Sequence, residues 1–184
     1  MRTRPFGEIH EGLVVEGRPV TAGVFDERQV RAAAGITLML GSAALALAFL
    51  SKEYRPIETA TAFFFVDFAL RVGIGLGYSP VGRLARWLVP RGAPQWVSAR
   101  PKRFAWSLGL VMSLAMTVIT NSHVRGALPL SICLVCLALM WMEAVLGICL
   151  GCEIHSWMVR RGWAEHDAAF EICSGDVCAP RGKH

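Results

Sequence analysis

The chain has 184 residues, of which 54% are hydrophobic and only 18% are charged. This composition is too apolar for an ordinary soluble domain, and it excludes a disordered chain, a collagen-like fibre and a basic nucleic-acid-binding module. A membrane protein remains, with membrane lipid as its first partner. The length allows four membrane-spanning helices of about 20 residues in one bundle.

The apolar residues gather into four runs, each long enough to cross a bilayer. The first run carries no charge, whereas the second contains Asp67 and Arg71 and the fourth contains Glu143. We therefore expect an all-α, integral membrane four-helix bundle over residues 32–152, preceded by a segment 1–31 and followed by a Cys-containing tail 153–184. The runs are Ala32 to Leu50, Ile57 to Gly75, Phe104 to Thr120 and about Leu128 to Leu150.

Lysine and arginine residues predict the orientation of the bundle. The N-terminal segment, the loop between the second and third runs, and the tail hold five, six and four of them, whereas the other two loops hold three together. Positively charged loops resist translocation. We expect both termini and the central loop to be cytoplasmic, and this bias explains the formal net charge of +5 better than an acidic partner does.

A short helix is predicted in the central loop. Ser79 and Pro80 form a helix start, and Val81, Leu84 and Leu88 then recur at helical spacing, with arginines at positions 83 and 86 between them. The pattern predicts an amphipathic helix on the cytoplasmic membrane face. A solvated basic loop is the alternative.

Three charged residues fall inside the predicted spans. Asp67 and Arg71 are four residues apart, so they share one helix face and can pair. Glu143 lies at a similar depth on the fourth run, so it is expected to meet Arg71. The cluster either only holds helices together or forms a proton or anion pathway, because charges at membrane depth are costly and are often functional.

The six cysteines fall into three close pairs, which are Cys133 and Cys136, Cys149 and Cys152, and Cys173 and Cys178. The last two pairs lie on the predicted cytoplasmic side, where stable structural disulfides are rare. Thiol redox chemistry, sulfur transfer and metal binding remain as explanations.

The position of each pair separates these explanations. Cys133 and Cys136 are expected within hydrocarbon near the outer surface, where we interpret them as small packing residues. Cys149 and Cys152 lie about 24 Å further along what we expect to be the same continuous helix, at its cytoplasmic end. A helix C-terminus disfavours a thiolate, and Arg160 and Arg161 would offset this effect if the chain folds back.

A zinc site is an alternative for the tail. Cys149 and Cys152, followed after 20 residues by Cys173 and Cys178, approximate the spacing of a four-cysteine zinc site, although the last spacing is too long. His155, one turn beyond Cys152, would replace one sulfur as a ligand. No other cofactor is expected.

Several segments resemble one family of membrane proteins. They are FDERQVRAAAG before the first run, DFALR in the second, SPVGRLAR in the loop, PKRFAWSLG at the start of the third and EAVLGICLGCEIH at the end of the fourth. Over Val24 to Arg160 the chain resembles the bacterial family known as domain of unknown function 4395. Pro101, Arg103 and Phe104 match one motif of that family, and Cys149, Gly151 and Cys152 match another. The other two cysteine pairs have no counterpart in it.

The resemblance implies a multi-pass protein of the bacterial cytoplasmic (inner) membrane whose genes often lie near those of thioredoxin-like and rhodanese-like proteins. Our leading hypothesis is a thiol-redox or sulfur-relay protein in which Cys149 and Cys152 react with such a partner. Transport of a small anion such as a sulfur oxyanion, through the Asp67, Arg71 and Glu143 cluster, is the first alternative. The second is a structural subunit of a larger membrane complex with a zinc site in its tail.

Overall fold

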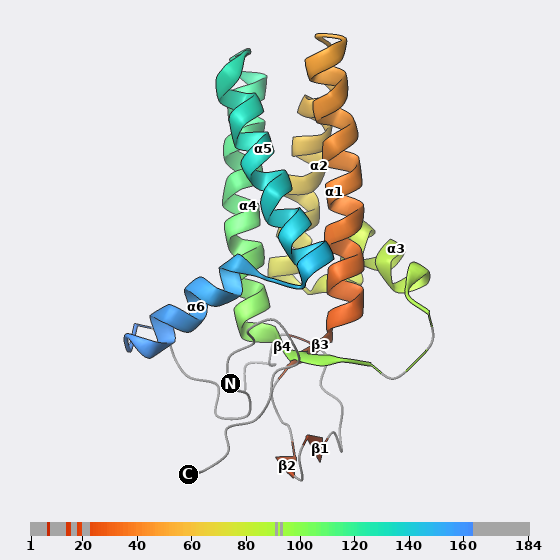
Figure 1. The fold of residues 1–184 in the computed structure, drawn as a ribbon, viewed down its shortest axis with the longest axis vertical. Coiled ribbons are helices and arrows are strands. Elements are labelled where there is room, and N and C mark those ends of the chain that lie inside the picture. The colour runs from red at the N-terminus through yellow and green to blue at the C-terminus, as the bar shows by residue number, and fades with distance from the viewer. Residues whose placement is uncertain are drawn as a thin grey trace.

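The computed structural model describes residues 7, 14–15, 18–19, 23–90, 92 and 94–163. This part of the chain is mostly helical, and its long helices lie nearly parallel to one another in a bundle (Figure 1). The six α-helices in this part are α1 (Glu27–Leu50), α2 (Arg55–Gly73), α3 (Pro80–Leu88), α4 (Ala99–Asn121), α5 (Ala127–Trp141) and α6 (Leu150–Arg160). A 3-10 turn, η1 (Leu76–Tyr78), precedes α3, and a π-helical turn, η2 (Met142–Leu146), follows α5.

Four long helices form the bundle and run alternately in opposite directions, α1, α2, α4 and α5 (Figure 1). Within the described residues, three segments are long and apolar enough to cross a membrane: α1, α4 and the continuous stretch Ala127–Leu146. The prediction of four spans is confirmed for these three. The fourth, α2, forms as a 19-residue helix in the bundle but contains Asp67 and Arg71 as well as charges in its first turn.

Two short strands bring the starts of α1 and α4 together. Strand β3 (Val24–Asp26) pairs antiparallel with β4 (Trp96–Ser98), and each strand leads directly into one of these helices. The Asp26 side chain caps α1 by accepting a hydrogen bond from the Arg28 amide at 3.1 Å. Separately, β1 (Val14–Val15) pairs with β2 (Arg18–Pro19).

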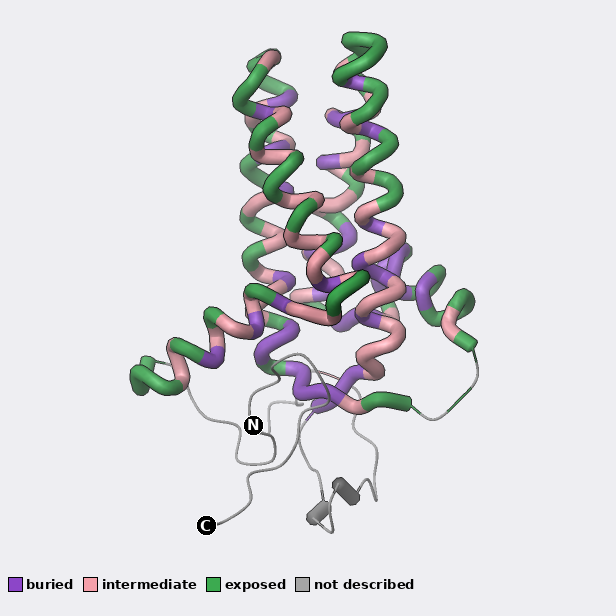
Figure 2. Tube along the Cα trace, in the orientation of Figure 1, coloured by how far each residue is buried: buried purple, intermediate pink, exposed green. Residues whose placement is uncertain are grey.

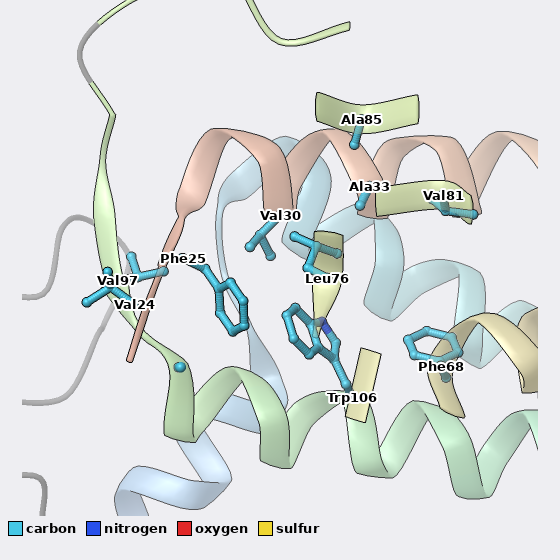
Figure 3. Close-up of a cluster of buried hydrophobic side chains, with 11 residues drawn as sticks. Val24, Phe25, Val30, Ala33, Phe68, Leu76, Val81, Ala85, Val97 and Trp106 are labelled. Atoms are coloured by element: carbon cyan, nitrogen blue, oxygen red, sulfur yellow. The ribbon is translucent and has the colours of Figure 1, made fainter. Parts of the chain in front are cut away.

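The principal hydrophobic cluster lies at the end of the bundle next to β3 and β4 (Figure 3). Its centre is Trp106, which is buried and whose ring centroid lies 5.0 Å from that of Phe25. Buried residues concentrate at this end, whereas the outer surfaces of the long helices are exposed along most of their length (Figure 2). Large apolar side chains such as Met39, Val111 and Leu134 lie on these surfaces, as expected of helices that face lipid.

The predicted amphipathic helix forms as α3, and Ser79 caps it by accepting a hydrogen bond from the Gly82 amide at 2.8 Å. Val81 and Ala85 pack against the bundle and are buried, whereas Leu84 and Leu88 are exposed. Exposed apolar side chains are expected on a helix that lies on the membrane face, and this placement of α3 stays a prediction. The small Ala85 allows α3 to approach α1 closely.

The prediction of one continuous helix from about Leu128 to Leu150 is wrong. The helix passes through η2 and ends at Gly147, which has a left-handed backbone with φ of 72°. A new helix, α6, begins at Leu150 and points away from the bundle (Figure 1). Glycine adopts this conformation without steric cost, so an uninterrupted apolar run conceals a sharp turn.

The contact between α3 and η1 leaves no room for a larger residue at Gly82. An added Cβ would lie 1.9 Å from the Leu76 carbonyl oxygen. We expect Gly82→Ala to lower the free energy of unfolding by about 1–3 kcal/mol, measured by thermal unfolding of the purified protein in detergent. Gly77→Ala is the matched control, since its Cβ would meet no atom within 4 Å. Equal losses in both variants would contradict this packing.

Candidate functional site

The Cys149 and Cys152 pair lies at the start of α6. Cys149 is the N-cap residue of that helix, and its Sγ accepts a hydrogen bond from the Cys152 amide at 3.3 Å. The two residues form a disulfide, with their Cα atoms 5.2 Å apart. Only 9% of Cys149 and 1% of Cys152 is exposed to solvent, so Cys149 is the more accessible of the two.

At this position the effect of the helix dipole on a cysteine thiolate is the opposite of the one expected from the sequence. The continuous-helix prediction placed both cysteines at a helix C-terminus, which disfavours a thiolate. In the structure they lie at a helix N-terminus, where the free N–H groups and the helix dipole stabilise negative charge on sulfur. The helix break at Gly147 is the physical cause of the change, and no return of Arg160 is needed to offset the dipole.

Arg31 of α1 stabilises the end of the helix that precedes Gly147. Its guanidinium donates hydrogen bonds to the carbonyl oxygens of Ala144 at 3.3 Å and Val145 at 2.8 Å. These carbonyls belong to the last turn before the break, where the helix no longer supplies their partners. Unpaired carbonyls are costly at membrane depth, so Arg31 stabilises the geometry that places Cys149.

Gly151 allows α6 to lie directly on α4. A Cβ at this position would be 2.6 Å from the Cβ of Ala105. The match of Gly151 to the family motif therefore has a packing explanation in this chain. The contact fixes the first turn of α6, and with it Cys152, against the bundle.

A buried lysine joins three segments next to this turn. Lys102 of α4 contacts Glu27 of α1 at 3.0 Å and Glu143 of η2 at 3.2 Å. Only 3% of the lysine side chain is exposed. Glu27 is the most accessible of the three, with 15% of its side chain exposed.

The predicted cluster of Asp67, Arg71 and Glu143 is rearranged in the structure. Asp67 and Arg71 form a buried ion pair, and Asp67 also accepts a hydrogen bond from the Val81 amide at 3.0 Å. The ion-pair partner of Glu143 is Lys102, at 3.2 Å. The contributions of Lys102, Glu27 and Arg31 were not predicted from the sequence, since each depends on contacts between segments far apart in the chain.

An apolar cavity of about 210 Å³ lies inside the bundle and extends to α6. Aromatic side chains of α2 and α4, including Phe64, Phe68 and Trp106, form part of its wall. Glu143 and Cys149 line it as well, and so do Cys133 and Cys136. The cavity therefore connects the two described cysteine pairs with the buried carboxylate.

The four remaining cysteines fall into two groups. Cys133 and Cys136 are free and partly buried on α5, and the interpretation of them as packing residues remains a prediction. Cys173 and Cys178 lie outside the described residues.

The described residues contain no group of three or more potential metal ligands. In the structure the sulfurs of Cys149 and Cys152 are bonded to each other, and the His155 ring packs against Phe104, with centroids 5.6 Å apart. Burial, together with the charge of Arg100, lowers the pKa of His155 below its usual 6.5, so this residue is neutral at pH 7. The predicted zinc site also includes Cys173 and Cys178, which lie outside the described residues.

These features define a helical protein with three candidate membrane spans and a Cys-x-x-Cys pair at a helix start. The chain belongs to the family described as Domain of unknown function (DUF4395), whose model matches residues 25–160. The resemblance found in the sequence is thereby confirmed. No curated protein and no solved structure matches the chain.

The lysine bridge generates a stability prediction. Lys102→Met leaves Glu27 and Glu143 buried without a cation, and we expect it to lower the free energy of unfolding by about 3–5 kcal/mol, measured by thermal unfolding in detergent. Lys52→Met, at an exposed position between α1 and α2, is the control and should change little. Adding Glu27→Gln and Glu143→Gln to Lys102→Met should restore part of the stability. A Lys102→Met protein as stable as the parent would show that the bridge is unimportant.

Proposed function

We propose that the protein is a multi-pass membrane thiol–disulfide oxidoreductase or sulfur-relay protein whose Cys149 and Cys152 exchange electrons or sulfane sulfur with a soluble thioredoxin-like or rhodanese-like partner. The observation that carries this proposal is the position of Cys149 as the N-cap of α6, bonded to Cys152 one turn later. The Cys-x-x-Cys spacing and the helix dipole together favour a disulfide that is reduced and re-formed reversibly.

The two sulfurs have different roles in this proposal. Cys149 is more accessible and accepts the Cys152 amide hydrogen bond, so it is the sulfur that a partner thiolate attacks. That attack breaks the Cys149–Cys152 bond and releases the Cys152 thiolate, with a mixed disulfide on Cys149. A second partner thiol then attacks the mixed disulfide, so the partner leaves oxidised and the pair remains as two thiols.

Charge distribution supports an orientation with this site in the cytoplasm. Among the described residues, nine lysines and arginines lie at the end of the bundle that carries Cys149, and three, Lys52, Arg55 and Arg125, lie in the opposite turns. The nine are Arg28, Arg31, Arg83, Arg86, Arg100, Lys102, Arg103, Arg160 and Arg161. The positive-inside rule then favours cytoplasmic termini and a bacterial inner membrane location.

Two other proposals use different features. Transport of a sulfur oxyanion would require Arg71 to release its partner, yet Asp67 pairs with it and Thr37 accepts a 3.4 Å hydrogen bond from it. Uptake into proteoliposomes tests this role. A structural subunit with a tail zinc site would instead copurify in fixed stoichiometry with a larger complex and would release zinc to a chelator.

Thiol trapping tests the leading proposal. The probe is a thioredoxin that retains only its nucleophilic cysteine, activated as a mixed disulfide with thionitrobenzoate. Reduced Cys152→Ser protein should attack it through Cys149, form a stable protein–thioredoxin disulfide and release thionitrobenzoate. Cys149→Ser should react about tenfold or more slowly, because Cys152 is buried and lacks the N-cap position.

The matched control replaces Cys133 and Cys136 with Ser in the Cys152→Ser background. It should leave both the adduct and the release rate unchanged. Equal rates for Cys149→Ser and Cys152→Ser, or an adduct that disappears in the control, would contradict the assignment of Cys149.

The proposed orientation makes a separate prediction. Reporters fused after Met1 and after His184 should both read cytoplasmic, and a reporter inserted near Asn121, at the opposite end of α4, should read external. Activity of paired cytoplasmic and periplasmic reporters measures each position. An external reading at either terminus would reverse the orientation.

A further inference from the structure

We propose that the apolar cavity binds the ring of a membrane quinone, which accepts the electrons of the reduced Cys149 and Cys152 pair. This inference rests on the redox function proposed above and adds its second substrate. In this inference the pair accepts electrons from a soluble dithiol and passes them to a lipid-soluble electron carrier.

The size and lining of the cavity fit such a ring. A protein cavity of about 150 Å³ lined by apolar side chains binds benzene, and this one measures about 210 Å³. Its aromatic residues Phe64, Phe68 and Trp106 offer surfaces for ring packing. Because α1, α4 and the stretch Ala127–Leu146, which have membrane-spanning composition, supply much of the lining, an apolar ligand would enter from the lipid phase.

The position of the sulfurs favours an acceptor inside the cavity. Cys149 lines the cavity, yet only 9% of the residue is exposed to solvent. The exposed part of Cys149 is sufficient for attack by a partner thiol. A large soluble oxidant has little room beside Cys152, which is almost fully buried. A planar, lipid-soluble molecule in the cavity reaches Cys149 without crossing the protein surface.

The reaction balances without a further co-reactant. The Cys149 thiolate adds to a ring carbon of the quinone, and the Cys152 thiolate then attacks the Cys149 sulfur. The carbon–sulfur bond breaks, and its electron pair passes to the ring. A disulfide and a quinol result, since the two thiols lose two electrons and two protons and the two carbonyl oxygens gain them.

Glu143 supplies a place for the protons in transit. Glu143 lines the cavity and its carboxylate contacts Lys102 Nζ at 3.2 Å, and Lys102 in turn contacts the partly exposed Glu27. The electrons pass from the dithiol to the quinone, as they do where membrane quinones withdraw electrons from protein dithiols in bacterial disulfide formation.

The experiment uses the full chain in detergent, reduced, freed of reductant and kept anaerobic. Decylubiquinone is the probe, and its absorbance change and the loss of free thiols are followed together. We expect one quinone to be reduced for each pair of thiols lost. Cys149→Ser and Cys152→Ser should each abolish the reaction, whereas Cys133→Ser with Cys136→Ser should preserve it.

A cavity-filling variant tests where the quinone binds. Met140 lines the cavity, whereas Leu134 on the same helix is exposed and does not. Met140→Trp should slow quinone reduction about tenfold or more, and the control Leu134→Trp should not. Both variants should keep their thermal unfolding temperature and their rate of reaction with activated thioredoxin.

The outcomes separate this inference from the function on which it rests. Reaction with activated thioredoxin but none with decylubiquinone overturns the quinone site and leaves the thiol function standing. Reaction with neither overturns both. Quinone reduction that depends on Cys133 and Cys136, or that is equally fast in Met140→Trp and Leu134→Trp, overturns the assignment of the cavity and of its sulfur pair.

Discussion

One buried ammonium group ties together three segments that are distant in the sequence. Lys102 Nζ lies between the carboxylates of Glu27 and Glu143, so α1, α4 and η2 meet at a single point. The β3 and β4 pairing brings Glu27 and Lys102 close, because it aligns the starts of their helices. The ion pairs in turn fix the end of the α5 segment. The turn that follows, and hence the position of Cys149, depends on this arrangement.

The end of that segment determines the chemistry of the cysteine pair. Had the helix continued, Cys149 and Cys152 would lie at its negative end and would resist ionisation. The left-handed Gly147 and the two carbonyls held by Arg31 instead start a new helix at Leu150. The same two residues thereby gain an electropositive environment suited to a thiolate. A break in the backbone, stabilised by tertiary contacts, therefore moves the pair from the C-terminal end of one helix to the N-terminal end of another.

The bundle combines a tightly packed end with a more open interior. Trp106 and Phe25 fill the region beside β3 and β4 (Figure 3), while further along the helices a cavity remains that Cys149 and Glu143 line. Packing at the first end anchors the ion pairs, since buried charges need fixed partners. Cys149 and Glu143, the sulfur and the carboxylate that the proposed reaction uses, both line this cavity. This division supports the proposed transfer of electrons between a soluble partner and the membrane.

The helical class, the approximate position of each long helix, the Ser79 start of α3 and the family could all be predicted from the amino-acid sequence. These features depend on local composition, spacing and motifs. The position where the last apolar run breaks, the buried face of α3 and the partner of Glu143 became apparent only in the folded chain. Apolar periodicity is the same in a continuous helix and in one interrupted at a glycine, and an ion pair between Lys102 and Glu143 leaves no trace in spacing along the chain. Such choices depend on long-range contacts, because a charge at membrane depth pairs with whichever opposite charge the packed helices bring within reach.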